Sequence, residues 1–180
     1  MPQGQLMRRI GIIAGILIFQ ILWLCLAGRN FLGPEGVWPL WQTRFEPAQN
    51  SKQFADWYSL LHIIFGMGIF VLLARFCPRW PLQYRALIML ISSTVWEVIE
   101  NAPWVIAVIN ASTQGPSYGG DSIINSLADT LFALCGFMLA RWLPGWILLL
   151  LAVVLETVVS LMINDGLLLG TLRLMGLGYR

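Results

Sequence analysis

Two glutamates and an asparagine interrupt an apolar stretch in the middle of the sequence. Glu97, Glu100 and Asn101 follow one another at spacings of three residues and one residue, so all three project from one face of a helix. An ionised carboxylate inside a bilayer costs a few kcal/mol or more, so it needs a partner or a wet cavity. Such carboxylates could bind a divalent cation, or two of them could share a proton.

A second polar stripe and a single histidine fall in two other apolar stretches. Asp121, Asn125 and Asp129 follow one another at four-residue steps, which drift by only about 40° per step around a helix. His62 is the one histidine of the chain. An imidazole beside carboxylates is suited to acid–base chemistry or to metal binding.

Together these groups predict a polar site that binds a small polar or amphipathic ligand. We expect Glu97, Glu100 and Asp129 to be the catalytic groups. The expected ligand-binding groups are His62, Asn101, Asp121 and Asn125. A metal or an acid pair there could activate water against an ester or amide of a lipid that enters sideways. The sequence identifies no cofactor and leaves a divalent metal open.

The same residues also have structural interpretations. Asp121 or Ser122 could cap the helix that follows them. His62 could be a buried histidine with satisfied hydrogen bonds, and Asp56 and Asp165 could be solvated groups at helix ends. The remaining acids could form a buried hydrogen-bond network that joins helices.

Apolar helices long enough to cross a membrane must position these groups. Of the 180 residues, 58% are hydrophobic and 11% are charged, which excludes an ordinary water-soluble domain. Apolar runs near 20 residues match a hydrocarbon layer about 30 Å thick. We therefore predict an all-α polytopic transmembrane bundle in one domain, with about five spans and a short interfacial or re-entrant C-terminal segment. The expected spans are 10–27, 57–76, 86–109, 122–140 and 145–163, and the expected extramembrane loop is 28–56.

Alternation of these spans brings His62 and both polar stripes to one leaflet, whichever way the protein is inserted. Arg75, Arg79 and Arg85 lie in one short turn, whereas the loop at 110–120 has no basic residue. Because basic residues favour cytoplasmic loops, we expect a cytoplasmic N-terminus and a site in the outer leaflet. Gly66, Gly68 and Gly136 are small enough for close helix packing, and we predict that they serve it.

Composition also bears on partners and on rival functions. The net charge of +2 is spread over several loops, which excludes nucleic acid as a partner and leaves membrane lipid as the expected one. Protein partners cannot be named from the sequence. A carrier or proton relay would need polar residues that continue to the cytoplasmic leaflet, where only Gln20 and Glu156 hint at them. A non-catalytic accessory subunit would need an exposed helix face of small residues.

Three motifs in the chain also match a known family in order and spacing. SKQFADWYSLLHIIFGMGIF (51–70), STVWEVIENAPWVI (93–106) and YGGDSIINSLADTLFALCGFMLA (118–140) resemble an uncharacterised family of multi-pass inner-membrane proteins of alphaproteobacteria. In motif style, the WExxEN and GDSxxNSxxDT strings also resemble VanZ-like membrane proteins. The resemblance implies a bacterial inner-membrane location and carries over no activity. Where the family pattern has a second histidine this chain has Phe65, which weakens a two-histidine metal site.

Overall fold

The described part of the chain is built from α-helices. The computed structural model describes residues 3–33, 36, 40–42, 50–112 and 118–174, and these residues form seven helices and no strand. The helices are α1 (Gln3–Leu26), α2 (Ser59–Phe76), α3 (Leu82–Glu100), α4 (Pro103–Ser112), α5 (Ile123–Trp142), α6 (Gly145–Ile163) and α7 (Leu167–Leu174). This confirms the predicted all-α fold. Parts of the expected loops at 28–56 and 110–120, and of the C-terminal tail, lie outside the described residues.

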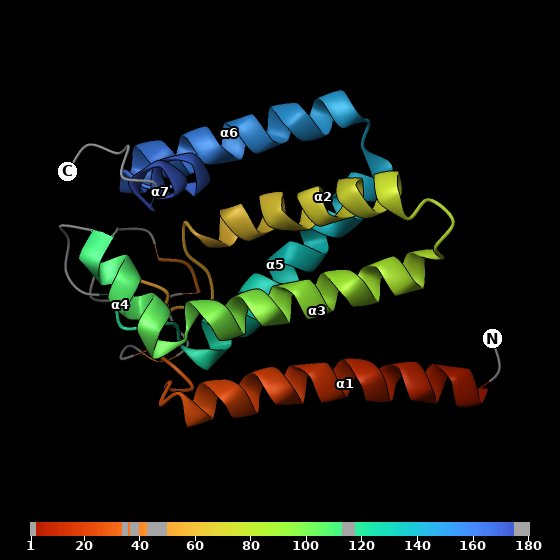
Figure 1. The fold of residues 1–180 in the computed structure, drawn as a ribbon, viewed down its shortest axis with the longest axis horizontal. Coiled ribbons are helices and arrows are strands. Elements are labelled where there is room, and N and C mark those ends of the chain that lie inside the picture. Colours follow the sequence, from red (N-terminus) through yellow and green to blue (C-terminus); the bar gives the residue numbers. More distant parts are fainter. Residues whose placement is uncertain (1–2, 34–35, 37–39, 43–49, 113–117, 175–180) are drawn as a thin grey trace.

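Four of the helices are long and apolar enough to cross a membrane. They are α1, α2, α5 and α6. The fifth long helix, α3, has 19 residues and runs beside the others (Figure 1), but its charged residues lower its hydropathy. The chain therefore has the character of a membrane protein, in rough agreement with the expected five spans.

The third expected span is divided in the structure. We expected one helix over 86–109, but α3 ends at Glu100 and α4 begins at Pro103. Proline has no N–H to donate, and its ring disfavours helical geometry at the residue before it. The chain turns through Asn101 and Ala102, whose N–H groups bond to the carbonyls of Glu97 and Ile99. α4 then leaves at an angle to α3 (Figure 1).

Two glycines bring α2 and α5 into backbone contact. A Cβ atom on Gly66 would lie 1.8 Å from the carbonyl oxygen of Ala133, and one on Gly136 would lie 2.0 Å from that of Ile63. The prediction of close packing is confirmed at both positions. It is wrong for Gly68, where no described atom would lie within 4 Å of a Cβ.

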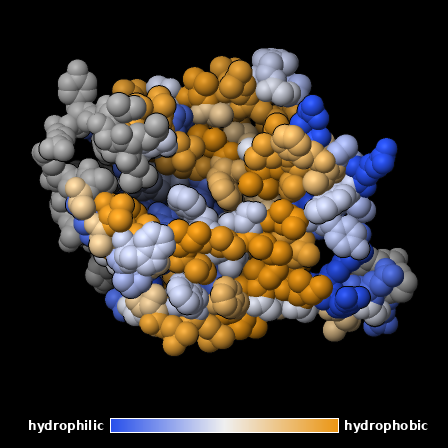
Figure 2. Space-filling view, viewed as in Figure 1, coloured by the Kyte–Doolittle hydropathy of each residue, from blue (hydrophilic) through white to orange (hydrophobic). Residues whose placement is uncertain are grey.

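The two ends of the bundle differ in their charges. α1, α3 and α6 begin at one end, where α2 and α5 finish (Figure 1). We call this the basic end because six arginines lie in its helix ends and turns: Arg8, Arg9, Arg75, Arg79, Arg85 and Arg141. Figure 2 shows hydrophilic side chains gathered there, beyond a largely hydrophobic surface. We call the opposite end, where α2 and α5 begin and α3 finishes, the polar end.

Buried apolar side chains fill the half of the bundle nearer the basic end. Met89 and Leu90 of α3 pack with Ala133 and Phe137 of α5 in one core cluster. The ring of Phe70 of α2 meets that of Phe137 edge-on, with centroids 5.1 Å apart. The buried polar residues of α3 and α5 lie nearer the polar end, where a second apolar cluster of Leu61, Val159 and Ile163 packs between α2 and α6.

Candidate functional site

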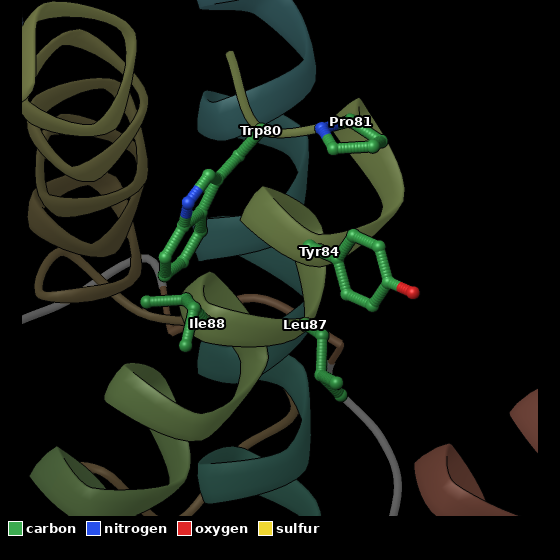
Figure 3. Close-up of a pocket in the computed structure, with 5 residues that line it drawn as sticks. All are labelled: Trp80, Pro81, Tyr84, Leu87 and Ile88. Atoms are coloured by element: carbon green, nitrogen blue, oxygen red, sulfur yellow. The ribbon is translucent and has the colours of Figure 1, made fainter. Parts of the chain in front are cut away.

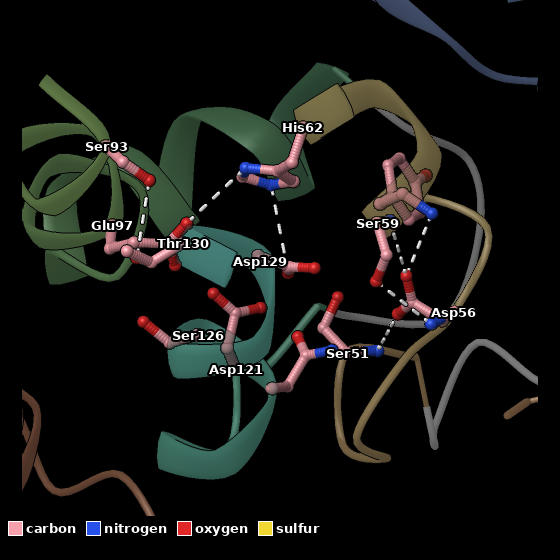
Figure 4. A network of polar contacts seen from close by, with 12 residues as sticks. Ser51, Asp56, Ser59, His62, Ser93, Glu97, Asp121, Ser126, Asp129 and Thr130 are labelled. Atoms are coloured by element: carbon pink, nitrogen blue, oxygen red, sulfur yellow. Dashed lines mark hydrogen bonds and ion pairs between the residues drawn. The ribbon is translucent and has the colours of Figure 1, made fainter. Parts of the chain in front are cut away.

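His62 lies between a carboxylate of α3 and a carboxylate of α5 (Figure 4). Its Nδ1 is 3.6 Å from Oε1 of Glu97, and its Nε2 is 3.7 Å from Oδ2 of Asp129. All three side chains are buried. Three helices therefore bring together, around one imidazole, residues that are far apart in the sequence.

Glu100 adds a second carboxylate from α3 to this group. One nitrogen of His62, one oxygen of Glu97 and one oxygen of Glu100 all lie within 4.8 Å of one another. Glu97 is fully buried, whereas Glu100 is partly exposed. The spacing of three residues on α3 thus turns both glutamates toward the histidine of α2, as the sequence pattern predicts.

Several buried polar atoms of the site have no hydrogen-bond partner in the described part of the chain. They are both carboxylate oxygens of Glu97, Oδ1 of Asp129, and the amide oxygen and nitrogen of Asn125. A buried polar group without a partner costs about 1–3 kcal/mol, so such groups are rare in folded proteins. A self-satisfied hydrogen-bond network between helices does not account for these atoms.

Asn101 and Asp121 form a separate, well-bonded group at the polar end. The Asn101 amide donates to Oδ2 of Asp121 at 2.5 Å, and its oxygen accepts the Asp121 backbone N–H at 2.8 Å. The Tyr118 hydroxyl donates to Oδ1 of Asp121 at 2.6 Å. Burial raises the pKa of Asp121, and the hydrogen bonds from Tyr118 and Asn101 oppose that shift. These contacts attach the segment before α5 to the end of α3.

Ser122, rather than Asp121, caps α5. The Ser122 hydroxyl accepts the backbone N–H of Asn125 at 3.2 Å, as is typical of a helix N-cap. Of the two residues that the sequence offered as a cap, the structure selects the serine. The Asp121 carboxylate is used instead in the contact with α3.

Asp56 is buried at the start of α2, so the interpretation of it as a solvated group is wrong. Its Oδ1 accepts the backbone N–H groups of Tyr58 at 2.8 Å and Ser59 at 3.3 Å, and its Oδ2 accepts that of Ser51 at 2.8 Å. The Ser59 hydroxyl in turn accepts the Asp56 N–H at 3.1 Å. Burial raises the pKa of Asp56 to about 6, although the Ser51 N–H opposes the shift.

This burial makes the stability of the fold depend on pH. The folded pKa of Asp56, about 6, lies above its usual value of 3.8, so folding favours the protonated carboxyl. That contribution is complete below about pH 4 and is lost as the pH rises through about 6. We expect the thermal unfolding midpoint in detergent to fall between pH 4 and pH 7, and Asp56→Asn to flatten the slope. An equal slope in wild type and variant would contradict the assignment to Asp56.

Two cations hold the glycines that precede Asp121. The Lys52 ammonium donates to the carbonyl of Gly120, and the Arg29 guanidinium donates to that of Gly119. Gly120 has a φ of 80°, and a Cβ there would meet the Arg29 guanidinium, so glycine is needed at this position. Burial lowers the pKa of Lys52, and the nearby Asp121 opposes the shift. No spacing in the sequence predicts these roles of Lys52 and Arg29, although the paired glycines at 119 and 120 indicate an unusual backbone conformation.

Gln20 joins three helices next to the site. Its amide nitrogen donates to the hydroxyls of Ser126 at 2.9 Å and Thr130 at 3.2 Å, both on α5. Its amide oxygen accepts the Thr94 hydroxyl of α3 at 3.2 Å. Gln20 is the one residue that interrupts the apolar stretch 10–26, and this was the sequence signal for the contact.

The two acids nearest the C-terminus stabilise local structure outside the cluster. Oε2 of Glu156 on α6 accepts the backbone N–H of Leu167 at 3.2 Å, and Oε1 accepts that of Leu168 at 2.9 Å. Glu156 therefore caps the N-terminus of α7, although it lies on α6. Asp165 accepts the Tyr58 hydroxyl at 2.9 Å.

A groove of about 400 Å³ lies near the basic end, far from these acids. It is lined by Trp80, Pro81, Tyr84, Leu87 and Ile88 at the start of α3 (Figure 3). None of these side chains is a carboxylate or an imidazole. The groove is suited to apolar groups such as acyl chains. The histidine and the carboxylates of the sequence motifs lie nearer the polar end.

Comparison with known proteins places the chain in a family. The family model described as "Protein of unknown function (DUF2585)" matches residues 12–176. The chain belongs to the DUF2585 family. This confirms the resemblance to an alphaproteobacterial family that the three sequence motifs indicated.

The relatives of this DUF2585 chain align over most of their length. A UPF0314 protein of Brucella anthropi is 36% identical over 164 residues, which cover 91% of this chain and 83% of the relative. A UPF0314 protein of Sphingopyxis alaskensis is 34% identical over 165 residues, which cover 92% and 84%. One of Paracoccus denitrificans is 32% identical over 160 residues, which cover 89% and 83%. No solved structure matches the chain.

In this DUF2585 chain the predicted site residues fall into two groups. Glu97 and Glu100 lie on one side of His62 and Asp129 lies on the other, and the unpartnered amide of Asn125 belongs to the same stretch of α5 as Asp129. Asn101 and Asp121 instead bond to each other. The first group has free donors and acceptors for a ligand, whereas the second supports the wall of the site.

Proposed function

We propose that this chain is a bacterial inner-membrane protein that binds the polar headgroup of an amphipathic lipid and hydrolyses a bond in it. The reacting groups are Glu97, Glu100 and Asp129, with His62 between them. Support comes from their position in a bundle of membrane-type helices, where a lipid is the most abundant neighbour. Figure 2 shows a hollow with hydrophilic side chains near α4, within a largely hydrophobic face, through which a headgroup could enter.

The proposed orientation puts the N-terminus in the cytoplasm. Six arginines gather at the basic end, and basic residues are retained on the cytoplasmic side of membrane proteins. The acids around His62 lie at the opposite end. In this orientation the site faces the outer leaflet.

One observation carries the proposal: the buried carboxylates of Glu97 and Asp129 keep unpartnered oxygens on either side of His62. A carboxylate held in this way can accept a proton from a water that attacks an ester or amide carbonyl, and can return that proton to the leaving oxygen or nitrogen as the bond breaks. The unpartnered amide nitrogen of Asn125 can donate to the oxygen on which negative charge develops. Binding and acid–base chemistry then use the groups that the protein leaves free.

The proposal predicts a specific loss of lipid hydrolysis in Asp129→Asn. We expect wild-type protein, reconstituted in nanodiscs of phosphatidylethanolamine and phosphatidylglycerol, to release products detectable by mass spectrometry. Removal of the ionisable group should slow release by about 100- to 10,000-fold, the usual contribution of general acid–base catalysis. Glu156→Gln is the control, because Glu156 bonds to the backbone of α7 and lies outside the cluster. No product from wild type, or equal rates in both variants, would refute lipid hydrolysis.

A carrier or proton relay fits the arrangement less well. Its polar path would have to continue beyond Gln20 toward the basic end. The described core side chains there are apolar, with Met89, Leu90, Ala133 and Phe137 packed in one cluster. These described core residues offer no polar path from Gln20 to the basic end, which favours a ligand site over a relay.

One observation favours an accessory subunit as the second candidate function. Gly11 and Gly15 of α1 form an open small-residue face, because no described atom would lie within 4 Å of a Cβ on either. Against it, an accessory role leaves the unpartnered oxygens of Glu97 and Asp129 without a use. The hydrolysis assay separates the two functions, because an accessory subunit alone would release no product.

A further inference from the structure

His62, Glu97 and Glu100 form the most convergent set of donor atoms in the described part of the chain. One donor atom from each lies within 4.8 Å of the other two. They come from two different helices, α2 and α3, so the arrangement is a product of the fold and not of local sequence alone. Donor atoms this close can reach one ion that sits between them.

Burial of these carboxylates is energetically unfavourable unless a positive charge lies between them. Glu97 is fully buried, and neither of its carboxylate oxygens has a hydrogen-bond partner among the described residues. The nearest side chain that can carry a positive charge is His62. Its Nδ1 lies 3.6 Å from Oε1 of Glu97, which is longer than a hydrogen bond. Burying an unpaired charge is unfavourable, and a bound cation removes that cost.

We propose that His62 Nδ1, Glu97 and Glu100 bind a divalent cation. One imidazole nitrogen and two carboxylates suit a transition-metal ion such as Zn²⁺ or Mn²⁺ better than Mg²⁺ or Ca²⁺, which take oxygen ligands. Three protein ligands also leave coordination positions open to water or to a headgroup. The inference deepens the proposed lipid hydrolysis, and the role of the ion in that reaction rests on the proposed function.

Asp129 is the positioning residue of this site. Its Oδ2 lies 3.7 Å from Nε2 of His62, on the side of the ring away from Glu97. A proton on Nε2 directed at Asp129 leaves the lone pair of Nδ1 for the cation. Carboxylates behind a ligating histidine fix its orientation and its tautomer in many metal sites. The Oδ1 atom of Asp129, which is unpartnered, stays available for the ligand.

The test measures binding of Zn²⁺ and Mn²⁺ to the full chain purified in detergent. After dialysis against each metal salt, elemental analysis is expected to find one ion per wild-type chain, and Glu97→Gln and Glu100→Gln are each expected to lose it. Both replacements nearly preserve shape, and size-exclusion profiles show whether each variant is folded. Glu156→Gln should keep the ion. No ion in wild type, or undiminished binding in Glu97→Gln, would overturn the site.

Graded variants test the positioning role. Asp129→Leu should weaken metal affinity about 10- to 100-fold without changing the stoichiometry, the usual effect of losing such a partner. Asp129→Asn, which keeps an acceptor for Nε2–H, should restore part of that affinity. Unchanged affinity in Asp129→Leu would overturn the role.

The metal site and the lipid hydrolysis can fail separately. Metal binding without product release would overturn the proposed function and leave the site intact. Product release that persists after the protein is stripped by a chelator, and that Zn²⁺ and Mn²⁺ do not raise, would overturn the role of the ion. We expect a chelator to remove the ion and stop product release, and we expect added metal to restore both.

Discussion

Gly66→Ala is expected to destabilise the protein by at least about 3 kcal/mol, at the upper end for overpacked cores. The new Cβ would lie 1.8 Å from the carbonyl oxygen of Ala133, and backbone atoms at 2.7 and 2.9 Å surround the same point. These contacts are with the backbone of α5, so no side-chain rotation can relieve them. α2 and α5 must separate, and folded protein should be lost during purification in detergent. The measurement is the midpoint of thermal unfolding, with the size-exclusion profile as a second readout.

Gly68→Ala provides a control on the same helix. No described atom would lie within 4 Å of a Cβ at Gly68, and alanine favours the helical conformation over glycine. We expect this variant to equal wild type in stability or to exceed it slightly. Similar behaviour of the two variants would contradict the close contact of α2 with α5.

The second large effect is expected from Asp56→Ala, at about 2–3 kcal/mol. The variant removes the acceptor of three backbone N–H groups, those of Ser51, Tyr58 and Ser59, in a buried position. A buried N–H group left without an acceptor costs about 1–3 kcal/mol, and loss of a helix cap costs about 0.5–2 kcal/mol. The start of α2 should fray, which hydrogen exchange of the amides from 57 to 62 would detect alongside a lower unfolding midpoint.

Asp165→Asn is the control for Asp56→Ala. Asp165 is only partly buried, and asparagine still offers an oxygen to the Tyr58 hydroxyl. We expect its unfolding free energy to stay within about 0.5 kcal/mol of wild type, as at most surface positions. A loss as large as that of Asp56→Ala would point to a general effect of removing acids.

Periodicity was sufficient to predict most of the helices and the common direction of two acids on α3. Glu97 and Glu100 lie three residues apart, and that spacing alone turns both toward a neighbouring helix. Pro103 indicated that the helix expected over 86–109 is interrupted. The sequence could not decide whether that helix bends or ends there, because this depends on contacts of α4 with the rest of the fold. Apolar length therefore predicted one span where the structure has two helices.

The long-range partners of single residues could not be read from the sequence. Asp56 resembles an exposed residue at a helix end, yet its burial depends on how the segment around Ser51 folds back over it. Glu156 stands alone in an apolar helix, and its partners lie 11 and 12 residues away on α7. Lys52 and Arg29 bond to backbone carbonyls, for which side-chain spacing gives no signal.

The glycine contact between α2 and α5 also sets the register of the site. Gly66 lies one turn below His62 on α2, and Ala133 lies one turn below Asp129 on α5. Gly66 with Ala133, and Gly136 with Ile63, form two reciprocal approaches that allow weak Cα–H···O bonds in both directions. A slip of either helix by one residue would break both approaches at once. These two glycine contacts therefore fix α2 and α5 relative to each other, so that the imidazole of His62 stays at the same height in the bundle as the carboxylate of Asp129.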